Sequence, residues 1–147
     1  VFCNTKVMCQ RLSDDLRRAG IRADCLHGDI KQATREKTMA DFRHGKLPVL
    51  IATDVASRGI DVDDVDGVIN YDVPEENEYY IHRIGRTGRA RKKGISFTLL
   101  GSFPEKAKLD EIAKFAGFRI VPMIFDEYGC LVPAPAEEKH PTSRRRF

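Results

Sequence analysis

Val49-Leu50-Ile51-Ala52 is an uninterrupted apolar run, introduced by Pro48 and followed directly by Thr53 and Asp54. Such a run is typical of a central strand in a parallel sheet, because that strand is buried on both of its faces. On either side of it, short apolar segments alternate with longer segments of helical period. This alternation favours a parallel sheet with helices on both faces, so the sequence predicts an α/β fold.

The remaining strands are short apolar segments before and after this run. We expect them at residues 1–3, 23–27, 67–71 and 94–100. Together with the central run they predict a sheet of about five to six strands.

Capping residues mark where the predicted helices begin. The helices are expected at residues 5–18, 29–45, 75–84 and 102–115. Asn4 or Thr5 caps the first helix. Pairs with capping-box spacing open the second and the last, Asp29 with Gln32 and Ser102 with Glu105. We expect the first two helices to bury Val7, Leu12, Leu16, Ala33, Met39, Ala40 and Phe42.

Length and composition limit the class of protein. The chain has 147 residues, enough for one hydrophobic core, which we place in a domain of residues 1–117. Beyond it the pattern decays into prolines and an arginine run at 144–146, which predicts a partly irregular extension over residues 118–147. No apolar stretch approaches the ~20 residues that span a bilayer, so we expect a soluble, cytoplasmic protein. The four cysteines form no C-x-x-C pair, so we expect reduced thiols and no metal site.

Charge is segregated along the chain, although the net charge is only +3. Residues 61–78 hold eight acids and no Lys or Arg, whereas residues 82–93 hold six cations and no acid. This distribution favours a local site for anions over a uniformly basic surface.

The basic segment contains His82-Arg83-Ile84-Gly85-Arg86-Thr87-Gly88-Arg89. At about 100° per residue, a continuous helix would project His82, Arg86 and Arg89 within about 60° of one another. Guanidinium groups clustered in this way match phosphate oxygens, and the two glycines let a phosphate or another backbone approach. The alternative interpretation is a solvated basic helix end that pairs with the neighbouring acids.

A second polar segment, Thr53-Asp54-Val55-Ala56-Ser57-Arg58-Gly59-Ile60-Asp61, directly follows the central run. In open parallel sheets ligands bind beyond the carboxyl ends of the strands, so we expect a site here. Alternatively, Thr53 and Asp54 simply cap the turn that follows. The sequence has no G-x-x-x-x-G-K-[ST] phosphate loop, so binding a nucleotide would require another domain.

In order along residues 1–101, these segments resemble the second RecA-like domain of DEAD-box RNA helicases. Val1-Phe2-Cys3-Asn4-Thr5-Lys6 resembles motif IV of that family, and His27-Gly28-Asp29 with Gln32 and Arg35 resembles the segment after it. Residues 53–61 resemble motif V. Residues 82–89 resemble motif VI, whose opening histidine distinguishes this family from related helicases.

The resemblance implies catalytic roles for Arg86, Arg89 and His82. Arg86, as an arginine finger, and Arg89 would contact the γ-phosphate of ATP held by the N-terminal RecA-like domain of the same parent chain, which would also hold Mg²⁺. Gly59 and Asp61 would contact the ribose, and His82 would couple RNA binding to hydrolysis. The path of the RNA backbone would be lined by Asn4, Thr5, Lys6, Gly28, Gln32, Arg35, Thr53 and Arg58.

Three classes of function remain open. The leading one is half of an ATP-dependent RNA helicase, inactive as an ATPase by itself, whose contacts to the RNA backbone carry no sequence specificity. The second is part of a related DNA helicase, and the third is a stand-alone RNA-binding or protein-docking module. Three roles are open for residues 117–133, namely packing against the domain, a bridge to an accessory RNA-binding domain, and self-association. The sequence does not identify the RNA substrate.

Overall fold

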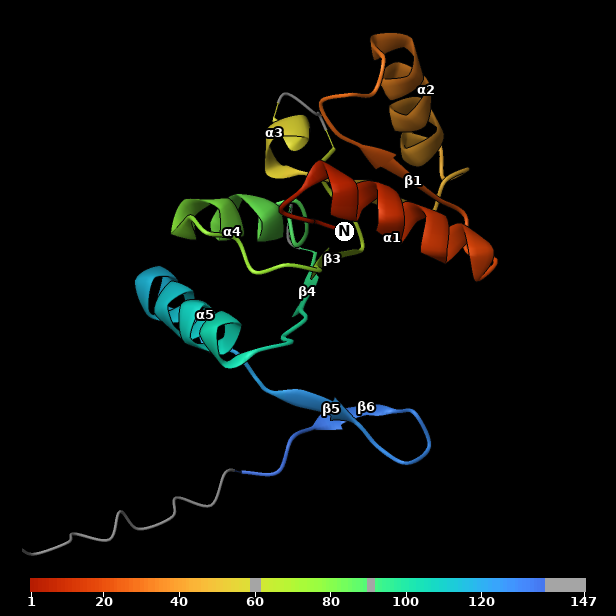
Figure 1. The fold of residues 1–147 in the computed structure, drawn as a ribbon. Helices are drawn as coiled ribbons and strands as arrows, with labels where there is room; N and C mark the ends of the chain where they lie inside the picture. Colours follow the sequence, from red (N-terminus) through yellow and green to blue (C-terminus); the bar gives the residue numbers. More distant parts are fainter. Residues whose placement is uncertain (59–61, 90–91, 137–147) are drawn as a thin grey trace, which may run out of the picture. The chain divides into compact units, whose positions relative to one another are not determined.

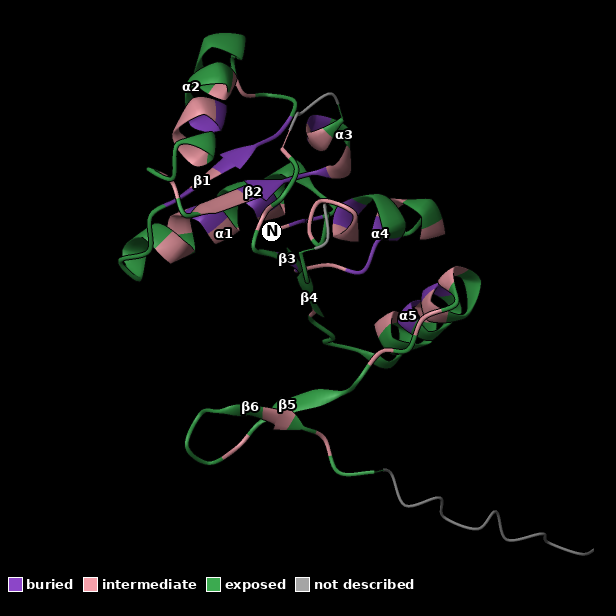
Figure 2. Cartoon of the chain, turned by 180° about the vertical axis from the view of Figure 1, so that it is seen from behind, coloured by how far each residue is buried: buried purple, intermediate pink, exposed green. Residues whose placement is uncertain are grey.

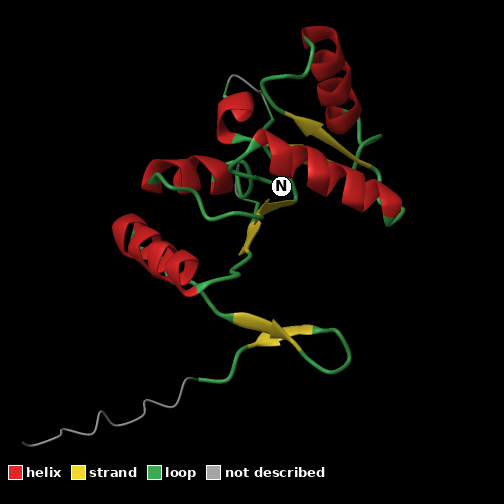
Figure 3. Ribbon diagram, viewed as in Figure 1, coloured by secondary structure: helices red, strands yellow, loops and turns green. Residues whose placement is uncertain are grey.

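The computed structural model describes residues 1–58, 62–89 and 92–136 of the chain. The chain divides into two compact units, Val1–Ala116 and Gly117–Phe147. In the first unit, helices and strands alternate along the chain (Figure 1, Figure 3). The arginine run at residues 144–146 lies outside the described residues.

Within the described part of the first unit, the named strands all pair in parallel. These strands are β1 (Ala23–Leu26) with β2 (Val49–Ala52), and β3 (Gly67–Asn70) with β4 (Ile95–Thr98). Phe2 lies between the two pairs and bridges Ala52 on one side and Asn70 on the other. The spatial order is therefore β1, β2, Phe2, β3, β4.

The apolar runs predicted the positions of these four strands, but residues 1–3 do not form the strand we expected. Only Phe2 makes ladder bridges there, because the chain turns into a helix at Lys6. The Phe2 N–H donates to the Ile69 carbonyl at 2.8 Å, and the Cys3 N–H donates to the Ala52 carbonyl at 3.0 Å. The expected sheet of five to six strands is not confirmed, because the described parallel sheet consists of four named strands and the bridging residue Phe2.

Side chains of β1 and β2 alternate between two faces, and each face is covered by helix. On one face, α1 (Lys6–Arg18) contributes to a buried cluster of Cys3, Cys9, Ala23, Cys25 and Ile51. On the other face, α2 (Gln32–Arg43) and α3 (Asp54–Ser57) contribute to a cluster of Leu26, Met39, Ala52 and Ala56. The core therefore lies around β1 and β2.

Burial falls off across the sheet towards β4. On β4, Ile95 is 56% exposed and Phe97 is 40% exposed. Figure 2 shows this as a change from mostly purple on β1, and pink and purple on β2, to green on β4. The β1 and β2 side of the sheet is therefore the firmly packed part that positions the loops described below.

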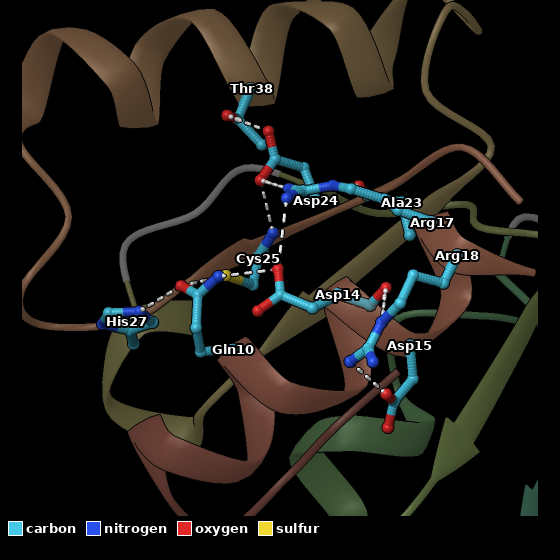
Figure 4. A network of polar contacts seen from close by, with 10 residues as sticks. All are labelled: Gln10, Asp14, Asp15, Arg17, Arg18, Ala23, Asp24, Cys25, His27 and Thr38. Carbon is cyan, nitrogen blue, oxygen red and sulfur yellow. Dashed lines mark hydrogen bonds and ion pairs between the residues drawn. The ribbon is translucent and has the colours of Figure 1, made fainter.

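Polar contacts hold α1 and α2 on β1 (Figure 4). Arg17 of α1 donates to the Ala23 carbonyl at 2.8 Å and to one carboxylate oxygen of Asp24 at 2.7 Å. The hydroxyl of Thr38, on α2, donates to the other oxygen of Asp24 at 3.3 Å. A single carboxylate on β1 thus contacts both helices.

Of the two residues predicted to cap α1, Thr5 is the N-cap, and its hydroxyl oxygen accepts from the Met8 N–H at 3.2 Å. Our prediction that Val7 is buried is wrong, because its side chain is 79% exposed. Met8, Leu12 and Leu16 pack on the core instead. They follow one another at i, i+4 spacing, and Val7 lies about 100° from Met8 around the helix.

The predicted capping box of Asp29 and Gln32 is also wrong. The helix α2 begins at Gln32, with Lys31 at the N-cap position and no side-chain hydrogen bond there. The Asp29 carboxylate instead pairs with Lys6 at 3.2 Å, a contact between segments far apart in the chain. Of the side chains expected to be buried on α2, Met39 is buried and Ala33 is exposed.

The last two helices of the first unit, α4 (Asn77–Ile84) and α5 (Phe103–Ala116), pack against each other. The capping box predicted before α5 is confirmed. The Glu105 N–H donates to the Ser102 hydroxyl at 3.4 Å, and the Glu105 carboxylate accepts from the Gly101 N–H at 2.8 Å.

The second unit contains a hairpin where the sequence predicted irregular chain. β5 (Met123–Phe125) pairs antiparallel with β6 (Leu131–Pro133). In the turn, Asp126 Oδ1 accepts from the Tyr128 N–H at 2.9 Å and the Cys130 N–H at 2.8 Å. Strands of three residues are too short to show an alternating pattern. Across the described chain, no helix has the length and apolar character needed to cross a bilayer.

Candidate nucleotide and nucleic-acid interface

Polar residues gather where the parallel segments of the first unit end. Asn4 follows Phe2, Gly28 follows β1, Thr53 follows β2, and Asp72 follows β3. Because the carboxyl ends of parallel strands lie at one edge of a sheet, these loops are neighbours. The Asn4 N–H donates to the Asp72 carboxylate at 2.8 Å, which joins two of the loops directly.

Arg83 of α4 reaches into this edge and is 1% exposed. Its guanidinium donates to both oxygens of Asp54, from Nε to Oδ1 at 2.7 Å and from Nη2 to Oδ2 at 2.6 Å. Nη1 donates to the Asp72 carbonyl at 2.8 Å, and Nη2 also donates to Asn4 Oδ1 at 2.8 Å. The same group lies 5.3 Å from the centroid of the Phe2 ring. One buried cation thus contacts three other segments of the chain, at residues 2–4, at Asp54 and at Asp72.

Arg86 and Arg89 converge on the carboxylate of Asp63. Arg89 Nη1 lies 2.7 Å from Asp63 Oδ2, and Arg86 Nη1 lies 3.7 Å from Asp63 Oδ1. The next cation, Lys92, pairs with Asp64 at 2.7 Å, and this hydrogen bond raises the pKa of the Lys92 ammonium group. Pairing of the basic segment with the neighbouring acids, which we gave as the alternative interpretation, is therefore present, and it also brings two guanidinium groups to one anion.

These arginines meet without the continuous helix that the spacing argument assumed. The helix α4 ends at Ile84, Gly85 is its C-cap, and Gly88 has φ +71°. A positive φ is readily adopted by glycine and rarely by other residues. The chain turns at these glycines, and a carboxylate from another loop then gathers the arginines.

A small cavity of about 60 Å³ lies between α3 and α4, with polar and aromatic residues around it. Its lining residues are Asp54, Ser57, Arg58, Tyr79, His82, Arg83 and Arg86. Arg58 Nη2 donates to the Tyr79 hydroxyl at 2.6 Å, and its guanidinium lies 5.2 Å from that ring's centroid. His82 is exposed. The cavity connects residues of the two predicted motifs.

Comparisons with known proteins match this arrangement to one family. The model of the helicase conserved C-terminal domain matches residues 1–91, which include the loops after Phe2, β1, β2 and β3 and the segment of Arg86 and Arg89. An ATP-dependent RNA helicase of Saccharomyces cerevisiae, FAL1, is 50% identical over 123 residues, covering 84% of this chain and 31% of that protein. This chain is a DEAD-box helicase C-terminal domain. It spans less than a third of the length of these curated relatives.

Solved structures show the same fold. The C-terminal domain of the DEAD-box protein Dbp5 has a TM-score of 0.73 and 38% identity, covering 79% of this chain and 68% of that one. A DEAD-box protein from Methanococcus jannaschii has a TM-score of 0.74 and 46% identity, covering 80% of this chain and 32% of that one. The fold is thus the RecA-like fold of DEAD-box C-terminal domains.

In this DEAD-box domain, two of the residues predicted to bind RNA use their hydroxyl oxygens as helix caps. Thr5 caps α1, and the Thr53 hydroxyl accepts from the Ala56 N–H at 3.3 Å. The capping role that we gave as the alternative for Thr53 is therefore present. A capping hydroxyl still has its own hydrogen to donate. Thr5 is exposed, whereas Thr53 is only 7% exposed, so the structure leaves the Thr5 hydroxyl open to a phosphate oxygen.

Other predicted RNA-binding residues are held by partners within the domain. Both ends of the Asn4 side-chain amide are engaged, with Oδ1 accepting from Arg83 and Nδ2 donating to the Val73 carbonyl at 2.9 Å. Lys6 pairs with Asp29, Gln32 donates to Glu36 at 3.2 Å, and Arg35 donates to the Ala56 carbonyl at 3.3 Å. Gly28 is exposed.

The DEAD-box pattern also includes residues that the structure does not describe. Gly59 and Asp61, predicted to contact the ribose, lie outside the described residues. Within the part of the chain that is described, no group of three His, Cys, Asp or Glu side chains is arranged to hold a metal ion. The assignments of ribose and Mg²⁺ therefore stay predictions.

Arg83 is the residue of this edge that we did not assign from the sequence. It lies in a basic segment of the sequence, and arginine side chains in such segments are usually exposed to solvent. One signal was available, because Tyr80 and Arg83 are three residues apart and both are buried on α4. An arginine on the apolar stripe of a short helix indicates a buried ion pair.

Gly94 closes the turn after the DEAD-box arginines, and its replacement by alanine is expected to destabilise the chain by about 1–3 kcal/mol, the usual cost of overpacking. An added Cβ would collide with the Gly88 backbone nitrogen and lie 2.7 Å from the Thr87 side chain. Gly28→Ala is the matched control, since a Cβ there meets nothing within 4 Å. Urea unfolding of both variants measures the effect, and equal midpoints would contradict the close approach.

Proposed function

We propose that this chain is the second RecA-like domain of an ATP-dependent RNA helicase, and that Arg86 and Arg89 complete an ATP site on the N-terminal domain of its parent protein. The observation that carries the proposal is the convergence of both guanidinium groups on Asp63. A carboxylate and a phosphate offer arginine the same kind of oxygen pair. The γ-phosphate would take the place that the Asp63 carboxylate holds in this domain.

In this role the arginines neutralise charge that develops on the phosphoryl group during transfer. Arg86 acts as the arginine finger, a contribution worth about 10³–10⁵ in rate in comparable enzymes. The N-terminal domain supplies Mg²⁺ and the phosphate loop, as the family resemblance implies. Gly59 and Asp61 contact the ribose, and His82 faces the same domain from the exposed side of α4.

The RNA-binding part of the proposal rests on the edge formed by the loops after Phe2, β1 and β2. Hydroxyls of Thr5 and Thr53, the exposed backbone at Gly28 and the side chain of Arg35 suit a sugar-phosphate backbone. Such contacts position a strand and do not read its bases. A solved Dbp5 structure with a TM-score of 0.74 and 38% identity, covering 79% of this chain and 31% of that one, is named as bound to RNA and ADP BeF3.

Both proposed sites lie on one sheet, so closure on the N-terminal domain would complete them together. ATP and RNA would then favour the same closed state, and each would raise the affinity for the other. This reciprocity is the physical basis for RNA-stimulated hydrolysis.

Phosphate release by the parent protein and by this chain alone tests the proposal. We expect the parent to hydrolyse ATP faster with single-stranded RNA than with DNA of the same sequence, and this chain alone to release no phosphate with either. Equal stimulation by DNA would favour a DNA helicase. A parent that lacks ATPase activity would favour a binding module, and RNA-stimulated hydrolysis by the isolated chain would refute the shared ATP site.

A further inference from the structure

We propose that Arg83 is the positioning residue that holds the RNA-binding loops and the ATP-binding arginines in one rigid arrangement. This inference rests on the function proposed above and adds a residue to which that function assigns no contact. Arg83 is 1% exposed, so it cannot touch RNA or nucleotide itself. It acts through the groups that it holds.

Two of the residues that Arg83 contacts lie beside residues of the proposed RNA site. Asn4 precedes Thr5, and Asp54 follows Thr53, so the guanidinium contacts the immediate neighbours of two threonines predicted to bind RNA. Along its own chain, Arg83 comes three residues before Arg86. The segment that carries the finger is thereby fastened to both RNA-binding loops.

The geometry of these contacts requires a guanidinium. Four hydrogen bonds leave from three nitrogens, and they reach a carboxylate, a backbone carbonyl and a side-chain amide. An arginine offers five N–H donors in a rigid planar fork, whereas a lysine offers three from a single atom. Arg83→Lys therefore keeps the charge beside Asp54 while losing the fork that spans the segments.

Burial distinguishes this cluster from the other ion pairs of the edge. The side chains of Arg83 and Asp54 are 1% and 16% exposed, whereas those of Arg89 and Asp63 are 53% and 36% exposed. Exposed pairs are loosened by water and salt, whereas buried pairs are screened much less. The Arg83 contacts are the ones that persist when a ligand displaces Asp63 from the finger arginines.

The test compares RNA affinity with and without nucleotide in the parent protein. A fluorescein-labelled single-stranded RNA is titrated in the absence and presence of a non-hydrolysable ATP analogue, and the ratio of the two dissociation constants measures the coupling. In Arg83→Lys we expect this ratio to fall by at least about fivefold, a typical size of coupling between sites. The dissociation constants for RNA alone and for the analogue alone should each change by a smaller factor than this ratio. With saturating RNA, the factor by which kcat for ATP hydrolysis falls should exceed the factor by which KM for ATP rises.

Arg17→Lys is the matched control. Arg17 also donates to a carboxylate and to a backbone carbonyl, but it joins α1 to β1 at the opposite end of the strand (Figure 4). We expect its coupling ratio to equal that of the wild type. A similar loss in both variants would show a general loss of packing and would overturn the inference.

A folded Arg83→Lys protein with the wild-type ratio would overturn the inference, as would equal losses of both separate affinities without a change in the ratio. If Arg83→Lys does not fold, the double variant Asp54→Asn, Arg83→Gln removes both buried charges together. Retained coupling in that variant overturns the inference, and lost coupling with intact separate affinities supports it. A wild-type parent without RNA-stimulated ATPase activity would instead contradict the proposed function.

Discussion

Arg86→Ala in the parent protein is expected to lower kcat for RNA-stimulated ATP hydrolysis by about 10³–10⁵-fold, the contribution of an arginine finger. The affinity for RNA is expected to stay close to that of the wild type, because Arg86 contacts Asp63 and Ser57, neither of which is among the residues predicted to bind RNA. Steady-state phosphate release and RNA titration measure the two quantities on the same preparation.

Lys92→Ala is the control for this experiment. Lys92 is a neighbouring cation that also pairs with an aspartate of the same acidic loop, at 2.7 Å from Asp64. Its removal changes the local charge by the same amount and should leave kcat within about twofold, since exposed pairs contribute little. Comparable losses of kcat in Arg86→Ala and Lys92→Ala would assign the effect to general charge, and comparable losses of RNA affinity and kcat in Arg86→Ala would contradict a finger role.

Arg83→Met is expected to lower the free energy of unfolding of this chain by about 3–5 kcal/mol, because it leaves the Asp54 carboxylate buried without its partner. A loss of this size is a large share of the about 5–15 kcal/mol that stabilises a typical domain. Urea unfolding followed by circular dichroism measures it. The exposed pair of Arg89 and Asp63 serves as the comparison. Arg89→Met should lower the free energy of unfolding by no more than about 1 kcal/mol.

A double-mutant cycle separates the ion pair from the rest of the packing. In the double variant Arg83→Met, Asp54→Leu, the loss in free energy of unfolding should be smaller than the sum of the losses in the two single variants, because neither charge is then left without its partner. Additive costs would mean that the two side chains act independently. That result would contradict the bidentate contact, at 2.7 and 2.6 Å, as the source of the stability.

The sequence predicted those elements whose signal is local. β2 follows from four consecutive apolar residues, and the starts of α1 and α5 follow from Thr5 and from Ser102 with Glu105. The false capping box at Asp29 shows the limit of this reasoning, because a lysine more than twenty residues away takes the carboxylate. The hairpin at β5 and β6 escaped notice because each of its strands has only three residues.

The candidate site was predictable as a set of segments but not as a geometry. Loops at the carboxyl edge were expected from strand order alone, and the structure joins two of them through Asn4 and Asp72. The sequence could not show that Arg86 and Arg89 meet across a broken helix, since Gly85 and Gly88 turn the chain and Asp63 gathers the arginines. The spacing of Tyr80 and Arg83 on α4 is a local signal for a buried arginine, but the partners of Arg83 come from three segments distant in sequence, which no local pattern identifies.

The Asp63 carboxylate influences which dissolved anions can bind to Arg86 and Arg89. Because it is tethered beside Arg86 and Arg89, it competes with every dissolved anion at a high local concentration. Chloride competes weakly with this carboxylate for the guanidinium groups. It carries a single charge and has no pair of oxygens to accept their hydrogen bonds. A polyphosphate brings more charge and more oxygens, so the aspartate makes the arginines selective against the ordinary salts that surround them.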